Sequence, residues 1–303
     1  MRLCNWVGEV VLSVPALRRL EAAGYALQLV GRRWAPALLE GTGWPVLVRP
    51  PGLGAATAQL RGLRRALASA GGPAPRALLL TKSLSSALEA RLAGLAAAGY
   101  AHDGRSLLLA AAYPLPRFAH AAHAYWHLAS RWLGEDAPYP ASVELVPSAA
   151  QDAAARALLA AHGLAPRGFV LLCPFSGPDD RERRKVWPGF GALATALAAR
   201  ALPVVVCPGP GEDRLAAATL PRAIALAGVD LGVYAALLRL AHAVVANDTG
   251  PGHLAAAVGA RLVSIYGPQS VAAWAPLGPR VELLHDPGGW PPVARVAALV
   301  LDA

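Results

Sequence analysis

The sequence is poor in cysteine and in charged residues and lacks long apolar runs, and each of these shortages excludes a class of protein. Its three cysteines lie in or beside apolar runs and lack the spacing of a metal site or a disulfide framework, so we expect buried, reduced thiols. No apolar run reaches the roughly 18 residues that cross a bilayer, because arginine, glycine or proline interrupts each one. The opening residues also lack the apolar core of a signal peptide. We therefore expect a cytoplasmic protein.

Charged residues make up only 16% of the 303 residues and hydrophobic residues 55%, which favours a large core over disorder. Lysine is nearly absent, since Lys82 and Lys185 are the only two. Residues 1–148 contain 15 basic and 8 acidic residues, a net charge of +7, out of +9 for the chain. No basic run is interleaved with aromatics, so we expect no nucleic-acid partner. An anionic substrate or an anionic membrane surface fits this charge.

Short apolar runs alternate with longer segments of helical period, which predicts parallel sheets covered by helices. In the first half the expected strands are Leu3–Asn5, Ala26–Val30, Val46–Val48, Ala77–Leu80 and Leu107–Ala110, and the expected helices Val10–Ala23, Thr57–Ala70, Ser83–Ala98 and Phe118–Leu133. In the second half we expect strands Phe169–Cys173, Val204–Cys207, Ala243–Val245 and Leu262–Tyr266, and helices Ala149–Ala161, Phe190–Ala199, Asp213–Leu220, Leu231–Leu240 and Val293–Leu301.

The proline-containing segment 135–147 reads as an interdomain linker, so we expect domains at residues 1–147 and 148–303. Two such alternations predict an α/β protein with two doubly wound, Rossmann-like domains facing each other over a cleft. In these sheets ligands bind beyond the carboxyl ends of the strands. The terminal helix, Val293–Leu301, is expected to pack back on the first domain.

The stretch Ala243–Leu254 predicts a phosphate-binding turn. An apolar run stops at Asp248 and Thr249, Gly250 permits close backbone approach, and a helix begins near Pro251. The free N–H groups and positive dipole of such a helix start attract anions. The alternative is an ordinary connection between a strand and a helix, with the aspartate or threonine as its cap.

Three motifs resemble glycosyltransferase family 9, the lipopolysaccharide heptosyltransferases, and they occur in the family's order. The first is Trp6-Val7-Gly8-Glu9 followed by an apolar helix with Pro15-Ala16-Leu17; the second is Lys185-Val186-Trp187-Pro188. The third is Asn247–Leu254 with Ala255–Gly259, continued by Tyr266-Gly267-Pro268. The first motif looks closer to the second heptosyltransferase than to the first.

This resemblance implies the glycosyltransferase B fold, with an acceptor-binding N-terminal domain and a donor-binding C-terminal domain. The implied reaction moves heptose from ADP-heptose to the inner core of lipopolysaccharide, an anionic acceptor. The ADP-sugar is a substrate, so no cofactor is expected. The sequence contains no Asp-x-Asp pair, so we expect transfer without a metal. We also expect peripheral attachment to the cytoplasmic face of the inner membrane.

The resemblance assigns the proposed catalytic base to Glu9, where aspartate is common, and the donor's phosphates to Lys185. Considered without the resemblance, Glu9 is typical of a solvated acid at a helix start, and the charged run before Lys185 is typical of a mobile loop. The expected donor-binding residues are Ser176, Gly177, Lys185, Glu212, Asp248, Thr249, Gly250, Gly252 and His253; those for the acceptor are Gly8, Arg117 and His120.

Two assignments rest on side-chain type. Glu212 is preferred for the donor's ribose because Asp213 looks like the cap of the next helix. His120, His123 and His127 share one helix face, and we favour a polar, aromatic-flanked surface there over a metal site. Two other functions remain open: another glycosyltransferase or epimerase that uses a nucleotide sugar, and a non-catalytic nucleotide-binding protein.

Overall fold

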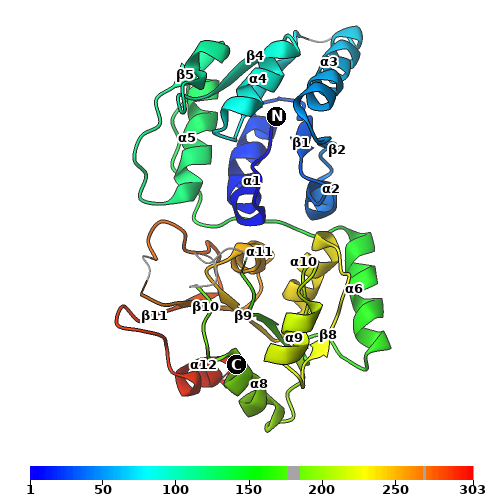
Figure 1. Cartoon of the computed structure of the whole chain (residues 1–303), viewed down its shortest axis with the longest axis vertical. Helices are drawn as coiled ribbons and strands as arrows, with labels where there is room; N and C mark the ends of the chain where they lie inside the picture. Colours follow the sequence, from blue (N-terminus) through cyan, green and yellow to red (C-terminus); the bar gives the residue numbers. More distant parts are fainter. Residues whose placement is uncertain (72, 177–184, 269–270, 303) are drawn as a thin grey trace. The chain divides into compact units, whose positions relative to one another are not determined.

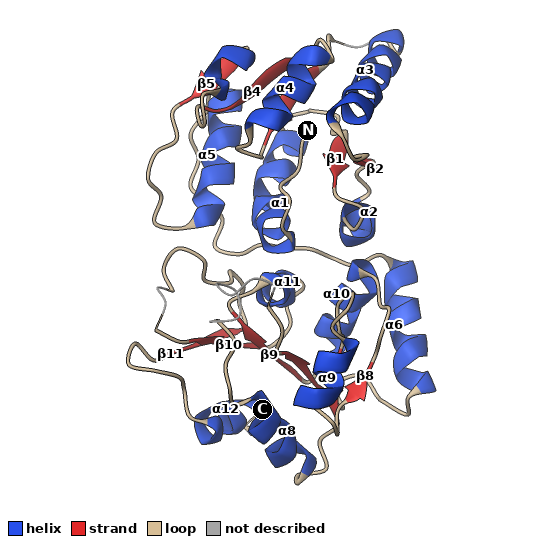
Figure 2. Cartoon of the chain, in the orientation of Figure 1, coloured by secondary structure: helices blue, strands red, loops and turns tan. Residues whose placement is uncertain are grey.

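The structure is a computed structural model that describes residues 1–71, 73–176, 185–268 and 271–302. The chain divides into two compact units, Met1–Leu39 with Gly43–Pro140, and Glu40–Thr42 with Ala141–Ala303 (Figure 1). Both units are parallel α/β structures, which confirms the predicted fold class (Figure 2).

The first unit has five short parallel strands in two sheets. They are β1 (Leu29–Gly31), β2 (Val46–Val48), β3 (Arg76–Leu79), β4 (Ala96–Tyr100) and β5 (Ala111–Tyr113), in the orders β1-β2 and β3-β4-β5. Arg2 connects the two sheets through single bridges to Val30 and Leu79. The expected strand at Leu3–Asn5 is therefore reduced to an extended segment, in which the N–H of Leu3 donates to Val30 O at 2.9 Å.

The helices of this unit are α1 (Val7–Ala22), α2 (Ala35–Leu39), α3 (Leu53–Ser69), α4 (Leu84–Leu92) and α5 (Ala121–Leu133), with a 3-10 turn at Arg105–Leu108. The 3-10 turn Glu40–Thr42 follows α2 in the chain but belongs to the second unit. Helix α1 forms much of the core of the unit because most of its residues are apolar and buried. Val10, Leu12 and Leu17 are at most 1% exposed. Helix α1 packs along α5, whose Leu128 is fully buried.

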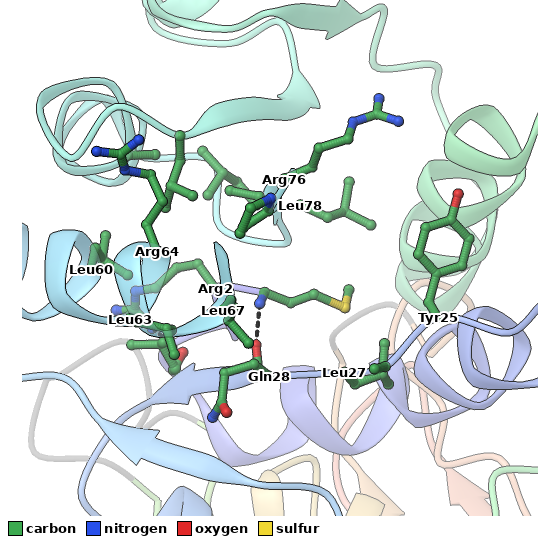
Figure 3. A pocket seen from close by; sticks show the side chains of 18 of the residues that line it. Arg2, Tyr25, Leu27, Gln28, Leu60, Leu63, Arg64, Leu67, Arg76 and Leu78 are labelled. Carbon is green, nitrogen blue, oxygen red and sulfur yellow. Dashed lines mark hydrogen bonds between the residues drawn. The ribbon is translucent and has the colours of Figure 1, made fainter. Parts of the chain in front are cut away.

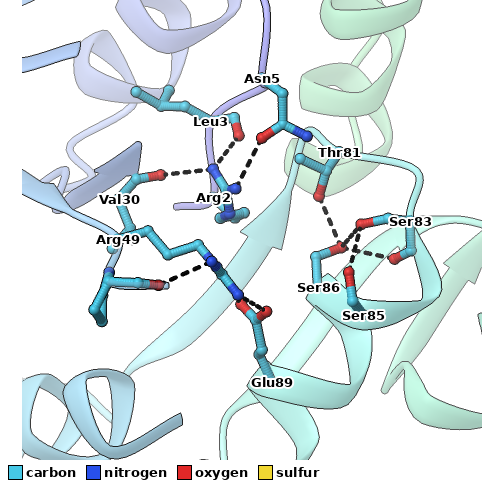
Figure 4. A network of polar contacts seen from close by, with 11 residues as sticks. Arg2, Leu3, Asn5, Val30, Arg49, Thr81, Ser83, Ser85, Ser86 and Glu89 are labelled. Carbon is cyan, nitrogen blue, oxygen red and sulfur yellow. Dashed lines mark hydrogen bonds and ion pairs between the residues drawn. The ribbon is translucent and has the colours of Figure 1, made fainter. Parts of the chain in front are cut away.

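A buried polar network joins the elements around Arg2 (Figure 4). The guanidinium of Arg2 donates to Leu3 O at 2.6 Å and to Asn5 Oδ1 at 3.0 Å. Beyond it, Arg49 donates two hydrogen bonds to the buried carboxylate of Glu89, at 2.5 and 3.1 Å. This bidentate pair links the end of β2 to α4, since Arg49 follows β2 and Glu89 lies in α4. The buried carboxylate requires such a charged partner.

The second unit has one six-stranded parallel sheet. Its strands are β6 (Val170–Cys173), β7 (Val204–Val206), β8 (Ile224–Ala225), β9 (Ala243–Asn247), β10 (Leu262–Tyr266) and β11 (Val281–His285), in the order β11-β10-β9-β6-β7-β8. Its described helices are α6 (Ala149–Ala161), α8 (Phe190–Ala198), α9 (Asp213–Thr219), α10 (Leu231–Leu240), α11 (Gly250–Ala257) and α12 (Val293–Leu301). The central strands β6 and β9 are buried along their whole length, as expected for strands covered on both faces.

Several elements predicted from the sequence have the observed bounds, and others do not. The predicted strands Val46–Val48 and Leu262–Tyr266 and the helices Ala149–Ala161, Leu231–Leu240 and Val293–Leu301 have the observed bounds. The predicted helix Ser83–Ala98 is wrong in its last part, since it ends at Leu92 and Ala96 begins β4. Gly94, at φ +74°, turns the chain there, and pairing with β3 and β5 then outweighs the helical propensity of alanine.

Three further elements differ from the prediction. The segment expected to be a strand at Leu107–Ala110 begins as a 3-10 turn, and β5 starts only at Ala111. The edge strands β8 and β11 were not predicted. Both carry exposed positions, so the apolar run that signals a buried strand is missing.

The division between the units comes after Pro140, seven residues before the expected boundary. Val143 and Leu145 are buried in the second unit, and the N–H of Leu145 donates to Ala257 O at 2.9 Å. Helix α12, which we expected to pack on the first domain, buries Val296 and Val300 in the core of the second unit beside α8. Among the described residues, no helix is both long and apolar enough to cross a membrane.

The Arg49–Glu89 pair is expected to stabilise the first unit strongly. Replacing Arg49 with glutamine leaves the carboxylate of Glu89, which is 3% exposed, without its charged partner. We expect Arg49→Gln to lower the free energy of unfolding by about 3 kcal/mol in chemical denaturation. As a control, Arg91→Gln on the exposed side of α4 should change it by no more than about 0.5 kcal/mol. A loss of that small size for Arg49→Gln would contradict this account.

Candidate functional site

In the first unit, Glu9 lies in the first turn of α1 and faces into the protein. Trp6 is the N-cap residue, and its backbone hydrogen-bonds the Glu9 carboxylate. The hydroxyl of Tyr125, on the neighbouring helix α5, donates to Glu9 Oε1 at 3.1 Å. Tyr125 is only 4% exposed, so the packing of α1 on α5 fixes the direction of the carboxylate. Hydrogen bonds and packing therefore fix the side chain of Glu9, which is not a freely solvated acid.

Burial raises the pKa of Glu9 above its ordinary value near 4.5. The hydrogen bond from Tyr125, the positive charge of Lys82 and the Trp6 backbone oppose this rise in pKa, in that order of size. A carboxylate whose pKa is moved toward neutrality accepts a proton more readily than a solvated one. The arrangement is chemically suited to a general base.

The position of Gly8 corrects one expectation. The expected helix began at Val10 and left Gly8 in the preceding loop, but Gly8 is buried as the second residue of α1. The reach of Glu9 is therefore set by its own side-chain rotamer and by Tyr125.

The histidines of α5 belong to an aromatic cluster. His120 is the N-cap of α5, and its Nδ1 accepts from the N–H of Ala122 at 3.2 Å. The Nδ1 of His127 lies 2.9 Å from the hydroxyl of Tyr100, and the two rings stack. The ring of His123 lies 5.0 Å from that of Tyr139. Arg117 is exposed in the segment before α5. Among the described residues no group of three potential ligands is arranged to hold a metal ion.

In the second unit, Asn247 joins the segments that follow two strands. It is fully buried at the end of β9; its Nδ2 donates to Pro174 O and its Oδ1 accepts from the N–H of Trp187, both at 2.9 Å. Pro174 follows β6, the neighbour of β9, so one amide holds both ends of the 174–187 segment. We had not assigned Asn247 a role. The sequence does mark this position, since the polar side chain of Asn247 ends an otherwise apolar strand.

Lys185 and Asp248 meet beside this amide. Lys185 Nζ lies 3.5 Å from Asp248 Oδ2, and the Tyr266 hydroxyl lies 3.3 Å from Asp248 Oδ1. Asp248 is 7% exposed whereas the side chain of Lys185 is 28% exposed. Burial, followed by the charge of Asp248, raises the pKa of Tyr266, which therefore stays protonated. The aspartate thus positions the lysine, whose side chain remains partly exposed.

Helix α11 starts beside the same residues, as the predicted turn requires. Thr249 is its N-cap, Gly250 its first residue and Pro251 its second, but Thr249 makes no side-chain capping hydrogen bond within the described structure. A Cβ on Gly252 would lie 3.2 Å from Asn247 O, so glycine allows the helix to start close to the strand end. The first N–H groups of such a helix start are suited to an anion.

The other predicted donor residues are placed as follows. Ser176 is half-buried after β6, and Gly177 and Arg181, Arg183 and Arg184 lie outside the described residues. Glu212 is the N-cap of α9 and its Oε2 accepts from the N–H of Gly209 at 2.8 Å. Our assignment of the cap to Asp213 was wrong, because Asp213 is the first helical residue. His253 is buried with its ring centre 6.5 Å from that of Trp274.

The three cysteines are unpaired thiols. Cys4 and Cys173 are buried and Cys207 is half-buried, and none of them forms a disulfide with another described residue. Burial raises the pKa of Cys4 and of Cys173 to about 12, so both stay protonated and unreactive near neutral pH.

Comparison with known proteins identifies the family. The sequence pattern of glycosyltransferase family 9 (heptosyltransferase) matches residues 63–290. The chain belongs to this family. A segment of 109 residues is 35% identical to lipopolysaccharide heptosyltransferase 3 of Escherichia coli, and it spans 33% of this chain and about a third (32%) of that relative.

Solved structures of this family have the same fold. The structure of E. coli ADP-heptose lps heptosyltransferase II covers 99% of this chain and 98% of its own, with a TM-score of 0.79 at 23% identity. The E. coli heptosyltransferase WaaC with ADP covers 100% and 99%, with a TM-score of 0.74 at 20% identity. This family 9 chain therefore has the predicted glycosyltransferase B fold.

The raised pKa of Glu9 predicts how a glutamine there affects stability. Above pH 4.5 the unfolded state loses its Glu9 proton before the folded state does, so ionisation of Glu9 destabilises the fold as the pH rises through its folded pKa. Glu9→Gln should therefore raise the Tm at pH 7 and give no gain below about pH 4.5. The exposed control Glu144→Gln should show neither effect. An equal gain for Glu9→Gln at pH 4 and pH 7 would attribute it to packing instead.

Proposed function

We propose that this protein is a glycosyltransferase that moves heptose from an ADP-heptose donor to the inner core of lipopolysaccharide. Membership of family 9 and the names of the related proteins support this proposal. The structural observation that carries it is the placement of Lys185, Asp248 and the start of α11 together at the carboxyl end of the second sheet. That is where an open parallel sheet binds its ligand.

On the donor side, the chemistry requires stabilisation of a departing diphosphate. The bond from the sugar to the phosphate breaks as the new bond forms, and negative charge accumulates on ADP. Lys185 supplies a positive charge, and the first N–H groups of α11 supply donors aligned with the helix dipole. In this proposal Asp248 and Asn247 are positioning residues, while Ser176, Thr249, Gly250 and Gly252 border the diphosphate. Glu212 accepts hydrogen bonds from the ribose, and His253 supports the turn.

On the acceptor side, a hydroxyl of the inner core attacks the sugar and transfers its proton to Glu9. The Tyr125 hydrogen bond orients the carboxylate, and the burial that raises the pKa of Glu9 suits it to take the proton. Gly8, Arg117 and His120 belong to this acceptor side. In this proposal the carboxylate takes the proton, the lysine and the helix start stabilise the departing diphosphate, and the transfer uses no metal and no cofactor.

The charge distribution supports the assignment of the acceptor. Residues 1–148 carry +7 of the net charge of +9, and an anionic core oligosaccharide is attracted to such a surface. The same charge suits peripheral attachment to the cytoplasmic face of the inner membrane, where anionic lipids gather.

Two other functions would use the same scaffold: transfer or epimerisation of another nucleotide sugar, and nucleotide binding without catalysis. Profiling purified protein with ADP-heptose and with ADP- and UDP-hexoses separates them. A hexose donor that outperforms ADP-heptose would replace the heptosyl proposal. ADP binding without any product would indicate the non-catalytic alternative.

The role of Lys185 can be measured without acceptor. Lys185→Ala removes the ammonium group proposed to meet the diphosphate, so the Kd for ADP in calorimetry should rise about tenfold or more. Arg214→Ala, which removes an exposed positive charge on α9, is the matched control and should leave the Kd unchanged. If both variants bind ADP like the parent protein, the diphosphate is not at Lys185.

The role of Glu9 can be measured with donor and acceptor together. Glu9→Gln keeps the shape and removes the basicity, so kcat should fall about a hundredfold or more while ADP binding is retained. Glu9→Asp should be much milder, because the family commonly has aspartate here. Turnover by Glu9→Gln at nearly the parental rate would make the carboxylate structural.

A further inference from the structure

A cavity of about 730 Å³ lies in the first unit, away from Glu9 (Figure 3). Residues of β1 and β3 contribute to its lining, and so does the N-terminal segment, whose Arg2 forms a single bridge to each of these strands. It reaches Leu20 of α1, eleven positions after Glu9, or about 16 Å along the helix at 1.5 Å per residue. The cavity is therefore at the far end of α1 from the proposed base.

One wall of the cavity is the apolar face of α3. Leu60, Leu63 and Leu67 recur at helical spacing, yet only Ala56 and Thr57 of this helix are buried. Figure 3 shows these leucines on one side of the cavity, with Tyr25 and Leu27 on the other. A volume within the range of ligand sites, lined largely by apolar side chains, is suited to a hydrocarbon chain.

The charged groups of the lining are almost all positive. They are Arg2, Arg64, Arg76 and a single acid, Glu89, whose carboxylate is already paired with Arg49. The buried Nε atoms of Arg2 and Arg64 have no hydrogen-bond partner among the residues that the structure describes. A buried guanidinium N–H without an acceptor is costly, and an anionic group would supply the acceptor.

We propose that this cavity binds one acyl chain of an anionic amphiphile. The chain lies against the leucines of α3, and the acidic head group lies at Arg64, whose buried Nε has no acceptor among the described residues. This chemistry is shared by a free fatty acid and by an anionic phospholipid of the membrane surface. The site is independent of the sugar-transfer site, so its occupancy does not require that the proposed function be correct.

The first test measures binding of soluble amphiphiles to the full chain by calorimetry, each below its micelle concentration. Dodecanoate should bind about fifteenfold more tightly than decanoate, since each buried methylene contributes about fourfold. Dodecyl phosphate should bind as dodecanoate does, and dodecyltrimethylammonium at least tenfold more weakly. Failure of dodecanoate to bind, or equal binding of the cationic amphiphile, would overturn the proposal.

Matched variants locate the binding. Leu63→Trp fills the cavity and should weaken dodecanoate binding at least tenfold, whereas Leu53→Trp, on the same helix outside the cavity, should not. Arg64→Gln should weaken it about fivefold or more, and the exposed neighbour Arg65→Gln should leave it unchanged. Leu60→Phe replaces Leu63→Trp if the latter unfolds. Equal effects of the lining and control variants would place the ligand elsewhere.

Vesicles distinguish the two sources of the chain. If Leu63→Trp weakens binding to phosphatidylglycerol vesicles as it weakens dodecanoate binding, the cavity takes its chain from the bilayer. If vesicle binding is unchanged while dodecanoate binding is lost, the ligand is a free single-chain acid. ADP binding, measured on the same variants, should stay at the parental value in both cases.

Discussion

The second unit depends on the two hydrogen bonds of one buried amide. Asn247 accepts from the backbone of Trp187 and donates to that of Pro174, so it joins two chain segments at the end of β9. Apart from Glu212, the residues proposed for the donor lie within a few residues of Asn247, Pro174 or Trp187. Lys185 precedes Trp187, and Asp248 follows the amide itself. A fully buried amide with both ends satisfied specifies one arrangement, because each alternative leaves a polar atom unpaired.

The constraint in the first unit is different, because the carboxylate of Glu9 is half-buried and must still be able to accept a proton. Burial raises the pKa of Glu9, whereas full solvation would leave it a weak base. The Tyr125 hydroxyl and the start of α1 offset part of the desolvation. The resulting group is less stable in its charged form than a surface acid, as groups at functional sites commonly are. The packing of α1 on α5 keeps the Tyr125 hydroxyl next to the Glu9 carboxylate.

The sequence predicted the architecture and the motif residues because these depend on local signals. Apolar runs buried on both faces, such as β9 and β10, and amphipathic helices with clear ends, such as α6, have such signals. It failed where tertiary pairing decides: Ala96–Ala98 reads as helix until β3 and β5 are present on either side. It also assigned Gly8 to a loop, since nothing local marks Trp6 as the N-cap. The partners Tyr125 and Asn247 act across 116 and 60 or more residues, a separation that no short motif spans.

The short turn Glu40–Thr42 has a consequence for how the chain can be divided. It belongs to the second unit although the residues on both sides of it belong to the first. The carboxylate of Glu40 accepts from Ser148 Oγ at 2.6 Å and from Gln151 Nε2 at 3.2 Å, and a Cβ on Gly41 would overlap Val146 O. The polypeptide thus passes between the units three times. Neither unit is a continuous fragment. A separately expressed second half would lack this turn, whereas the first half would carry the turn without its partners Ser148 and Gln151. Exchange of the second half between relatives must therefore include the turn.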